Sequence, residues 1–163
     1  MSKTKTQFSK EQLEKAKKLA NLMFMFKKIC NEKEAYFATL FELTPVEFRC
    51  VKYLYGREYV IVKELAKLMN LKPSRITRII TSLESKNFIK RTLDEEDRRN
   101  VRVMLNSGKK EKIEEMEKAY TELHQEILSP LNKNVAKKSI ADLEVMYDLF
   151  EKWVVENIRE SKK

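Results

Sequence analysis

The sequence predicts a mainly α-helical fold with one small β-hairpin. Only 2 glycines and 3 prolines occur among 163 residues, and this composition favours long helices over a β-rich fold. Through most of the chain, apolar residues recur at the spacing of an amphipathic helix. Residues 88–105 differ, because two runs rich in β-branched residues flank a polar turn there, which is typical of a hairpin.

Two short helices joined by a tight turn are predicted just before this hairpin. Residues 65–69 form the first helix, and Asn70 lies in the turn because asparagine tolerates a left-handed backbone. Pro73 begins the second helix, which runs to about Lys86, because proline suits the first position of a helix. Its apolar residues recur at i, i+3, i+4 and i+7: Ile76, Ile79, Ile80 and Leu83. This layout is typical of a helix-turn-helix.

The opposite face of the second helix carries cations and short hydroxyls but no carboxylate, since its one acid, Glu84, lies near the end. Arginine and hydroxyl side chains suit base edges in the major groove of DNA. The alternative is an ordinary core helix with a solvated face. The candidate DNA-binding residues of this helix are Ser74, Arg75, Thr77, Arg78 and Thr81.

The hairpin strands are predicted at 88–93 and 101–105, and the tip of the turn between them holds two arginines. A two-stranded hairpin that directly follows a recognition helix is a wing, and arginines at its tip suit phosphates or a narrow minor groove. Asp97 would repel phosphate, so we expect it to pair with a neighbouring arginine and fix the tip. The candidate DNA-binding residues of the wing are Lys90, Arg91, Asp97, Arg98 and Arg99.

Other helices flank these elements. A capping box at Ser9 begins the first, and a second box, formed by Thr44 and Glu47, begins the next. Residues 59–62 predict a short strand that can join the hairpin.

Two further helices are predicted after the hairpin. Asn106 or Ser107 caps the first, and Pro130 ends or bends it. Ser139 and Asp142 resemble another capping box, which places the start of the last helix there.

The helices outside the helix-turn-helix and hairpin each carry a large apolar stripe. A small lobe formed by the helix-turn-helix and hairpin cannot cover all of these stripes. A second copy of the chain, with interleaved terminal helices, would cover them. The sequence therefore predicts a homodimer with a winged helix-turn-helix lobe at 43–105 and a helical dimerisation region formed by 1–42 and 106–163. Trp153 and Phe150 should be buried between the two chains.

Composition narrows the function classes. The formal net charge of +9 favours a polyanionic partner. With no apolar run long enough for a membrane span and a polar N-terminus, we expect a cytoplasmic protein with no membrane partner. His124 is the only histidine, and the two glycines, Gly56 and Gly108, make no phosphate loop. We therefore expect neither an enzyme nor a cofactor or metal site.

The stretch from Leu43 to about Lys112 resembles the MarR family of bacterial winged-helix regulators. The resemblance is carried by the helix start at 43–48, the next helix start at 62–66, the recognition helix at 74–84 and the wing at 94–105, with Asp97 and Arg99 as an Asp-x-Arg signature. Three positions depart from the family pattern: Lys72, Asn87 and Asn106.

The resemblance implies a homodimeric, sequence-specific regulator, most often a repressor, that binds a pseudo-palindromic operator in double-stranded DNA. It also implies release by a small-molecule ligand or an oxidant. Two other functions stay open: a helical protein-interaction or scaffold module, and a nonspecific architectural DNA-binding protein.

Candidates for the effector site follow from the same resemblance. Cys30 lies near Lys27, Lys28 and Lys33, which could lower the pKa of a sensing thiol. Cys50 falls in an apolar pattern and is interpreted as core. A ligand pocket could form where the dimer helices meet the lobe, although core packing is the better explanation for any single one of its residues: Met23, Phe26, Phe37, Phe41 and Phe48.

Overall fold

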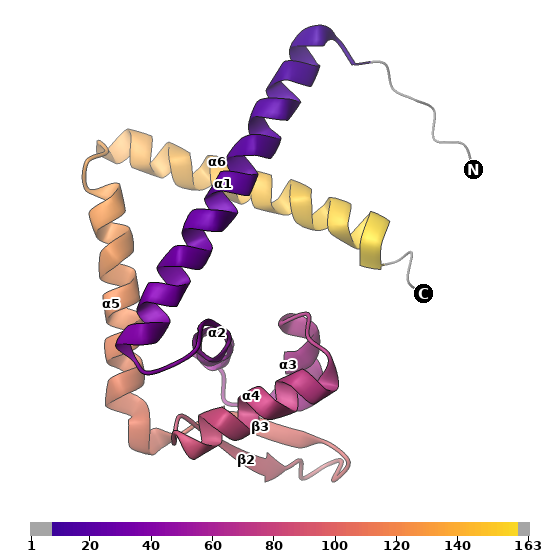
Figure 1. Ribbon diagram of the computed structural model, residues 1–163, viewed down its shortest axis with the longest axis vertical. Coiled ribbons are helices and arrows are strands. Elements are labelled where there is room, and N and C mark those ends of the chain that lie inside the picture. Colours follow the sequence, from indigo (N-terminus) through magenta and orange to yellow (C-terminus); the bar gives the residue numbers. More distant parts are fainter. Residues whose placement is uncertain (1–7, 160–163) are drawn as a thin grey trace. The chain divides into compact units, whose positions relative to one another are not determined.

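The computed structural model describes residues 8–159 (Figure 1). Helices dominate, and the only strands in this described part form one small sheet. The elements are α1 (Lys10–Leu40), α2 (Pro45–Leu54), β1 (Val60–Ile61), α3 (Val62–Leu68), α4 (Pro73–Ser85), β2 (Ile89–Leu93), β3 (Val101–Leu105), η1 (Ser107–Lys109), α5 (Lys110–Leu128), α6 (Lys133–Val154) and η2 (Val155–Arg159). The predicted fold class is confirmed.

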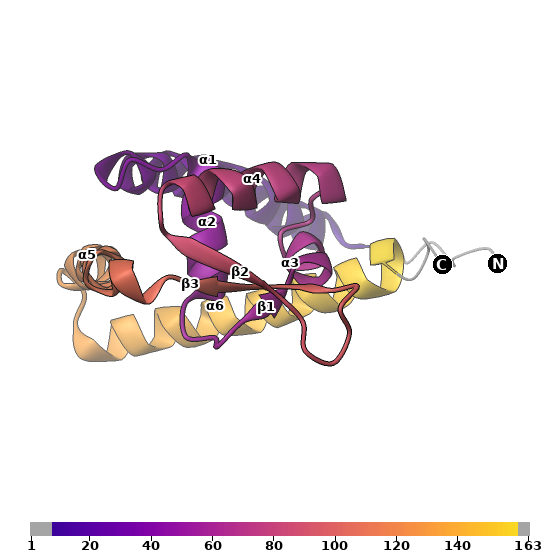
Figure 2. The same cartoon turned by 90° about the horizontal axis from the view of Figure 1, so that it is seen from below.

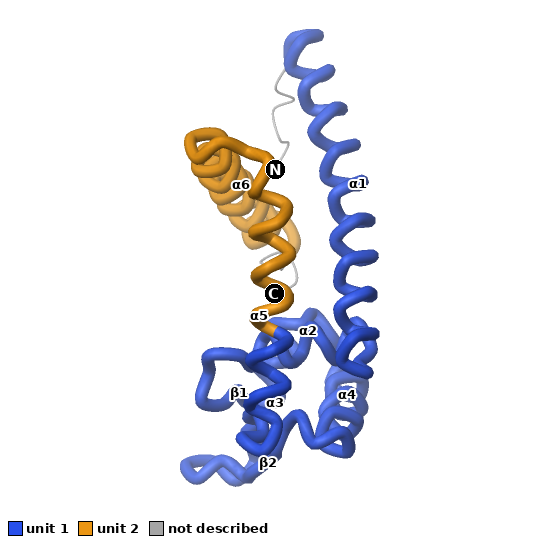
Figure 3. Tube along the Cα trace, turned by 90° about the vertical axis from the view of Figure 1, so that its left-hand side faces the viewer, with its two compact units in different colours: residues 1–116 blue, residues 117–163 orange. Residues whose placement is uncertain are grey.

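The chain divides into two compact units, residues 1–116 and 117–163 (Figure 3). This division differs from the predicted one, which separates a DNA-binding lobe at 43–105 from a dimerisation region at 1–42 and 106–163. The predicted division stays a prediction. The first unit contains every element from α1 to the first turns of α5, and therefore the whole lobe. The second contains the rest of α5 and α6.

The lobe is built on a three-stranded antiparallel sheet with the strand order β1-β3-β2. Val103 lies at its centre, paired with Val60 on one side and Arg91 on the other. The predicted strand at 59–62 is confirmed but shorter, because Val62 already begins α3. α4 follows α3 across a tight turn, and β2 follows α4 directly, which is the winged helix-turn-helix arrangement.

The apolar stripe predicted for α4 is the centre of the lobe core. Ile76, Ile80 and Leu83 are at most 1% exposed, and Ile79 is 6% exposed. Other side chains of the first unit that are almost inaccessible come from α2, α3, β2, β3 and the start of α5: Phe48, Leu54, Leu65, Ile89, Val103 and Met116. This burial fixes which face of α4 turns outward.

Turn residues behave as their chemistry predicts. Asn70, Asn87 and Gly56 all have positive φ, at 51°, 60° and 74°. Asparagine can therefore replace the glycine that the family favours at position 87. Glu42 also has a positive φ, of 58°, in the corner between α1 and α2, a conformation that its residue type does not predict.

The capping predictions are confirmed at two helices and wrong at one. Ser9 caps α1, and Thr44 caps α2, each within a complete capping box. The last helix begins earlier than predicted, at Lys133, where the Asn132 side chain accepts a hydrogen bond from the amide of Val135 at 3.0 Å. Ser139 and Asp142 therefore lie inside α6, because the stronger start signal is Asn132 just after Pro130.

Large parts of the terminal helices are exposed within one chain. In α1, which has 31 residues, only Phe37 and Ala38 are buried, and α6 has no buried residue. Among the described residues, no helix is both long and apolar enough to cross a membrane.

Candidate nucleic-acid interface

The outward face of α4 carries the side chains that the sequence predicted for it. All five candidate residues of this helix are exposed: Ser74, Arg75, Thr77, Arg78 and Thr81. Among the described residues, neither Arg75 nor Arg78 takes part in a salt bridge. Both guanidinium groups are therefore available to an anionic or hydrogen-bonding partner.

Thr77 differs from the simple expectation. Its hydroxyl donates a hydrogen bond to the carbonyl oxygen of Pro73 at 2.9 Å, one turn earlier in α4. The hydroxyl proton is therefore committed to the helix, and the methyl group is the part left to touch a partner. A threonine methyl suits the methyl group of thymine in the major groove.

The start of α4 has no side-chain cap. Lys72 occupies the cap position and makes no side-chain hydrogen bond there within the described chain. Its carbonyl oxygen accepts from the amides of Arg75 and Ile76 instead. An uncapped first turn leaves amide groups and the positive end of the helix dipole directed outward, where a phosphate is stabilised.

The wing lies on the same face of the lobe as α4 (Figure 2). Lys90 and Arg91 of β2 are exposed, and so are Arg98 and Arg99 in the turn. Arg91 forms an ion pair with Glu84 near the end of α4, which ties the wing to the recognition helix and partly neutralises Arg91.

A buried carboxylate that the sequence analysis missed organises the wing turn. Asp94 is 7% exposed, and its carboxylate accepts from the amides of Glu96 and Asp97, each at 2.9 Å. Its other oxygen accepts from Nε of Arg102 at 2.7 Å, and this ion pair lowers the pKa of Asp94, with help from the backbone amides. The Arg102 guanidinium also lies 4.3 Å from the ring centroid of Tyr59.

Asp97 holds the tip in a different way from the one expected. Its carboxylate accepts from the backbone amide of Arg99 at 3.0 Å and from the side-chain amide of Asn100 at 3.1 Å. Within residues 8–159 it makes no ion pair with an arginine, so the predicted pairing is wrong; Asp94 and Arg102 make that pair instead. Asp97 still orders the tip, through the backbone of the residue that carries the arginine.

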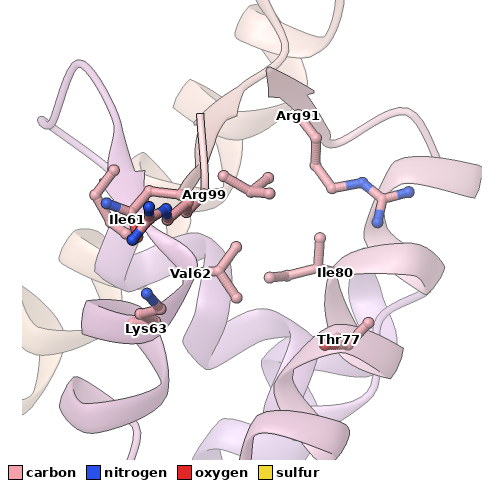
Figure 4. A pocket seen from close by; sticks show the side chains of 9 residues that line it. Ile61, Val62, Lys63, Thr77, Ile80, Arg91 and Arg99 are labelled. Carbon is pink, nitrogen blue, oxygen red and sulfur yellow. The ribbon is translucent and has the colours of Figure 1, made fainter. Parts of the chain in front are cut away.

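A hollow of about 200 Å³ separates the wing from the helix-turn-helix (Figure 4). Arg91 and Arg99 lie on opposite sides of it, with Val62 and Ile80 between them, and Thr77 and Lys63 at its lower edge. The structure thus brings basic side chains from α3, β2 and the wing turn around one apolar floor next to α4.

The aromatic residues proposed for a ligand pocket do not form one cluster. Phe37, Phe41 and Phe48 are buried within the first unit, with the rings of Phe37 and Phe48 6.4 Å apart. Phe26 is 52% exposed on α1, and Met23 is half-buried. A pocket made of all five residues stays a prediction, and it needs the second chain of the dimer to close it.

The two cysteines differ in burial. Cys50 is fully buried, and burial raises the pKa of its thiol to about 12, so it is an inert core residue. Cys30 is half-buried on α1, and its redox role stays a prediction. Within the described residues, no group of His, Cys, Asp or Glu side chains is arranged to hold a metal ion.

Sequence comparison identifies the lobe. Residues 43–101 match the model of the MarR family. The HTH-type transcriptional regulator SarZ from Staphylococcus haemolyticus is 25% identical over 87 residues, which are 53% of this chain and 59% of that protein. The match therefore spans little more than half the length of this relative.

Solved structures share the fold over most of the chain. A MarR transcriptional regulator from Methanosarcina mazei superposes with a TM-score of 0.72 at 18% identity, covering 83% of this chain and 98% of that one. The S. aureus MepR–DNA complex superposes with a TM-score of 0.67 at 20% identity, covering 81% and 97%. Both solved structures therefore share the fold of this chain, and its residues 43–101 are similar to the MarR family over the winged-helix lobe.

Proposed function

We propose that this protein is a sequence-specific DNA-binding transcriptional regulator that acts as a homodimer. One observation carries the proposal: the exposed face of α4, with Arg75 and Arg78 free of salt bridges within the described chain, lies on the same side of the lobe as a wing whose tip carries Arg98 and Arg99. An α4-type helix fits the major groove while the wing reaches the adjacent backbone or minor groove. The related MepR binds DNA in its crystal structure.

The homodimer is supported by the apolar side chains that one chain leaves exposed. Trp153 of α6 is 56% exposed, and Phe24 and Phe26 of α1 are 76% and 52% exposed. Apolar surface of this extent on terminal helices is typical of an obligate interface. Two lobes related by a two-fold axis would read a pseudo-palindromic operator.

As part of the same proposal, the protein represses transcription in the cytoplasm and is released by a small ligand or by oxidation. Occupying a promoter blocks polymerase without any chemistry. An effector would then act by favouring a dimer geometry in which the two α4 helices no longer match the half-sites.

Selection of bound sequences from a random duplex pool tests the proposal. We expect a pseudo-palindromic consensus, which would establish both specificity and dimeric binding. A pool that stays random while binding falls with salt would identify an architectural DNA-binding protein instead. No binding at low salt would favour a protein-interaction module. The promoter upstream of its own gene is the first specific target to test, by a gel-shift assay.

The largest loss of specificity is expected from Arg78→Ala. Arg78 lies mid-way along the exposed face of α4, where a bidentate contact to guanine is possible. If it reads a base, the substitution should cost about 1–3 kcal/mol on the selected operator and much less on random duplex. Lys118→Ala removes the same charge from an exposed site on α5 and should change neither affinity. Equal losses on both duplexes would make Arg78 a phosphate contact.

The wing variants should both weaken binding, although they change the charge in opposite directions. Arg99→Ala removes a tip cation and should reduce the salt dependence of affinity by about one unit of slope per wing if Arg99 touches a phosphate. Asp97→Ala removes an anion, yet the tip loses the two hydrogen bonds that Asp97 accepts from Arg99 and Asn100. Fluorescence anisotropy at several salt concentrations measures both. Tighter operator binding by Asp97→Ala at every salt concentration would make Asp97 a mere solvated turn residue.

A further inference from the structure

One nearly inaccessible carboxylate lies where α2 meets the end of α4. Glu47 is 3% exposed, and its carboxylate accepts four hydrogen bonds. Two come from Thr44 in its own capping box, from the backbone amide at 2.7 Å and the hydroxyl at 2.9 Å. The other two come from the last turn of α4 and the residue after it: Ser82 Oγ at 2.5 Å and Lys86 Nζ at 2.9 Å. Glu47 therefore joins α2 to the recognition helix.

Lys86 extends this link to α1. Besides Glu47, its ammonium group donates to the backbone carbonyl oxygen of Glu42 at 2.9 Å. Glu42 forms the corner between α1 and α2, with the left-handed φ of 58°. A second tie lies about two helical turns before that corner, where Glu34 of α1 accepts two hydrogen bonds from Arg49 of α2, at 3.1 and 2.6 Å. The end of α1 is thus held to α2, and through Lys86 to α4.

These polar ties restrain a motion that the lobe core does not. Apolar contacts under α4 are non-directional, so they resist separation from the core more than small rotations across it. Hydrogen bonds to a charged group lose strength steeply with angle and distance. The Lys86 and Ser82 bonds to Glu47 therefore fix the end of α4 against the corner that ends α1.

We infer that Lys86 is a positioning residue that sets the angle between α1 and the recognition helix, and thereby the half-site spacing that the dimer accepts. The inference rests on the proposed function, because it needs two lobes on one operator. Lys86 acts without touching a base. As part of the dimerisation region, α1 fixes the orientation of the lobe in the dimer. The hydrogen bonds that link Glu42, Lys86, Glu47 and Ser82 then fix the orientation of α4 relative to α1. We call these four residues the corner latch.

The test measures spacing preference with the full chain. The duplexes are the selected operator and two versions with one base pair inserted or removed between the half-sites, which shifts a half-site by about 3.4 Å along the axis. The unaltered protein should lose about tenfold or more on either altered duplex, as for one mismatched base pair. Lys86→Met keeps the apolar stem but removes both hydrogen bonds, and it should bind all three duplexes within about twofold of one another.

Three companion variants separate positioning from stability. Lys86→Arg keeps a cation that can bridge Glu42 and Glu47, so it should restore most of the spacing preference. Ser82→Ala breaks only the tie to α4, so it should weaken the preference without abolishing it, even if Lys86→Met fails to fold. Lys118→Met removes an exposed lysine on α5, 77% exposed, and should leave the preference unchanged.

The outcomes divide cleanly. Lower melting temperatures for Lys86→Met and Ser82→Ala with an unchanged spacing profile would overturn the latch and leave Lys86 a purely structural residue. An unaltered protein that selects an operator but tolerates every spacing would also overturn it, while DNA binding stands. An unaltered protein with no operator preference would overturn the proposed function itself, and the latch with it.

Discussion

Trp153→Glu should convert the protein from a dimer into a monomer or an insoluble chain. Trp153 is 56% exposed in the single chain, and Phe150, one turn earlier on the same face of α6, is 43% exposed. If this face is the interface, the new carboxylate is buried there without a partner, which costs roughly 3–5 kcal/mol per site. The two-fold axis places one such charge in each chain, so the dimer carries this free-energy cost twice.

Light scattering at several protein concentrations measures the change in assembly. Ala141→Glu is the matched control, because it adds the same charge to α6 in the polar row of Glu144, Asp148 and Lys152. It should leave the dimer intact. A stable monomer for the unaltered protein, or an unchanged dimer for Trp153→Glu, would contradict the proposed assembly.

The same variant should release DNA. In a dimer, binding of one lobe to its half-site holds the second lobe at a high effective concentration near the other half-site. A monomer loses this effect, so operator affinity should fall about 100-fold or more. Binding to a single half-site should stay unchanged, because the lobe does not contain Trp153. This comparison separates lost assembly from a damaged lobe.

The fold was predictable because its signals are local. The i, i+3, i+4 spacing of Ile76, Ile79 and Ile80 identified α4, and Pro73 marked its first residue. The left-handed turns at Asn70 and Asn87 follow from residue type alone. Each of these signals needs only a few neighbouring residues, and each is compatible with few other local conformations.

The polar network was not predictable because its partners are far apart in sequence. Glu47 was fully explained as a capping residue of α2, so nothing indicated a second use by Ser82, 35 residues later. Asp94 and Arg102 meet only because the hairpin register pairs Thr92 with Arg102. A register one residue different would turn Arg102 to the other face of the sheet. Such contacts depend on tertiary geometry that spacing alone does not contain.

Glu47→Gln should destabilise the protein at neutral pH and change how it responds to acid. Burial works to raise the pKa of Glu47, but hydrogen bonds from Lys86, Ser82 and Thr44 outweigh it and lower the pKa from 4.5 to about 2. Because the folded pKa lies below the unfolded one, the ionised carboxylate contributes stability above about pH 4.5. That stability is lost as pH falls toward 2. The shift corresponds to about 3 kcal/mol.

Urea unfolding at fixed protein concentration, at pH 7, 5 and 3, measures the prediction. Glu47→Gln should be less stable than the unaltered protein by about 3 kcal/mol at pH 7. The difference should shrink below pH 4.5, because the carboxylate is protonated there in the unfolded chain but stays ionised in the folded protein until about pH 2. The pKa of Asp94 is also lowered, but Asp94 is present in both proteins, so their difference isolates Glu47. Glu11→Gln, at a site 77% exposed, should change stability by less than about 0.5 kcal/mol at any pH. A constant difference between Glu47→Gln and the unaltered protein from pH 7 to 3 would mean that Glu47 stabilises the lobe by shape and not by charge.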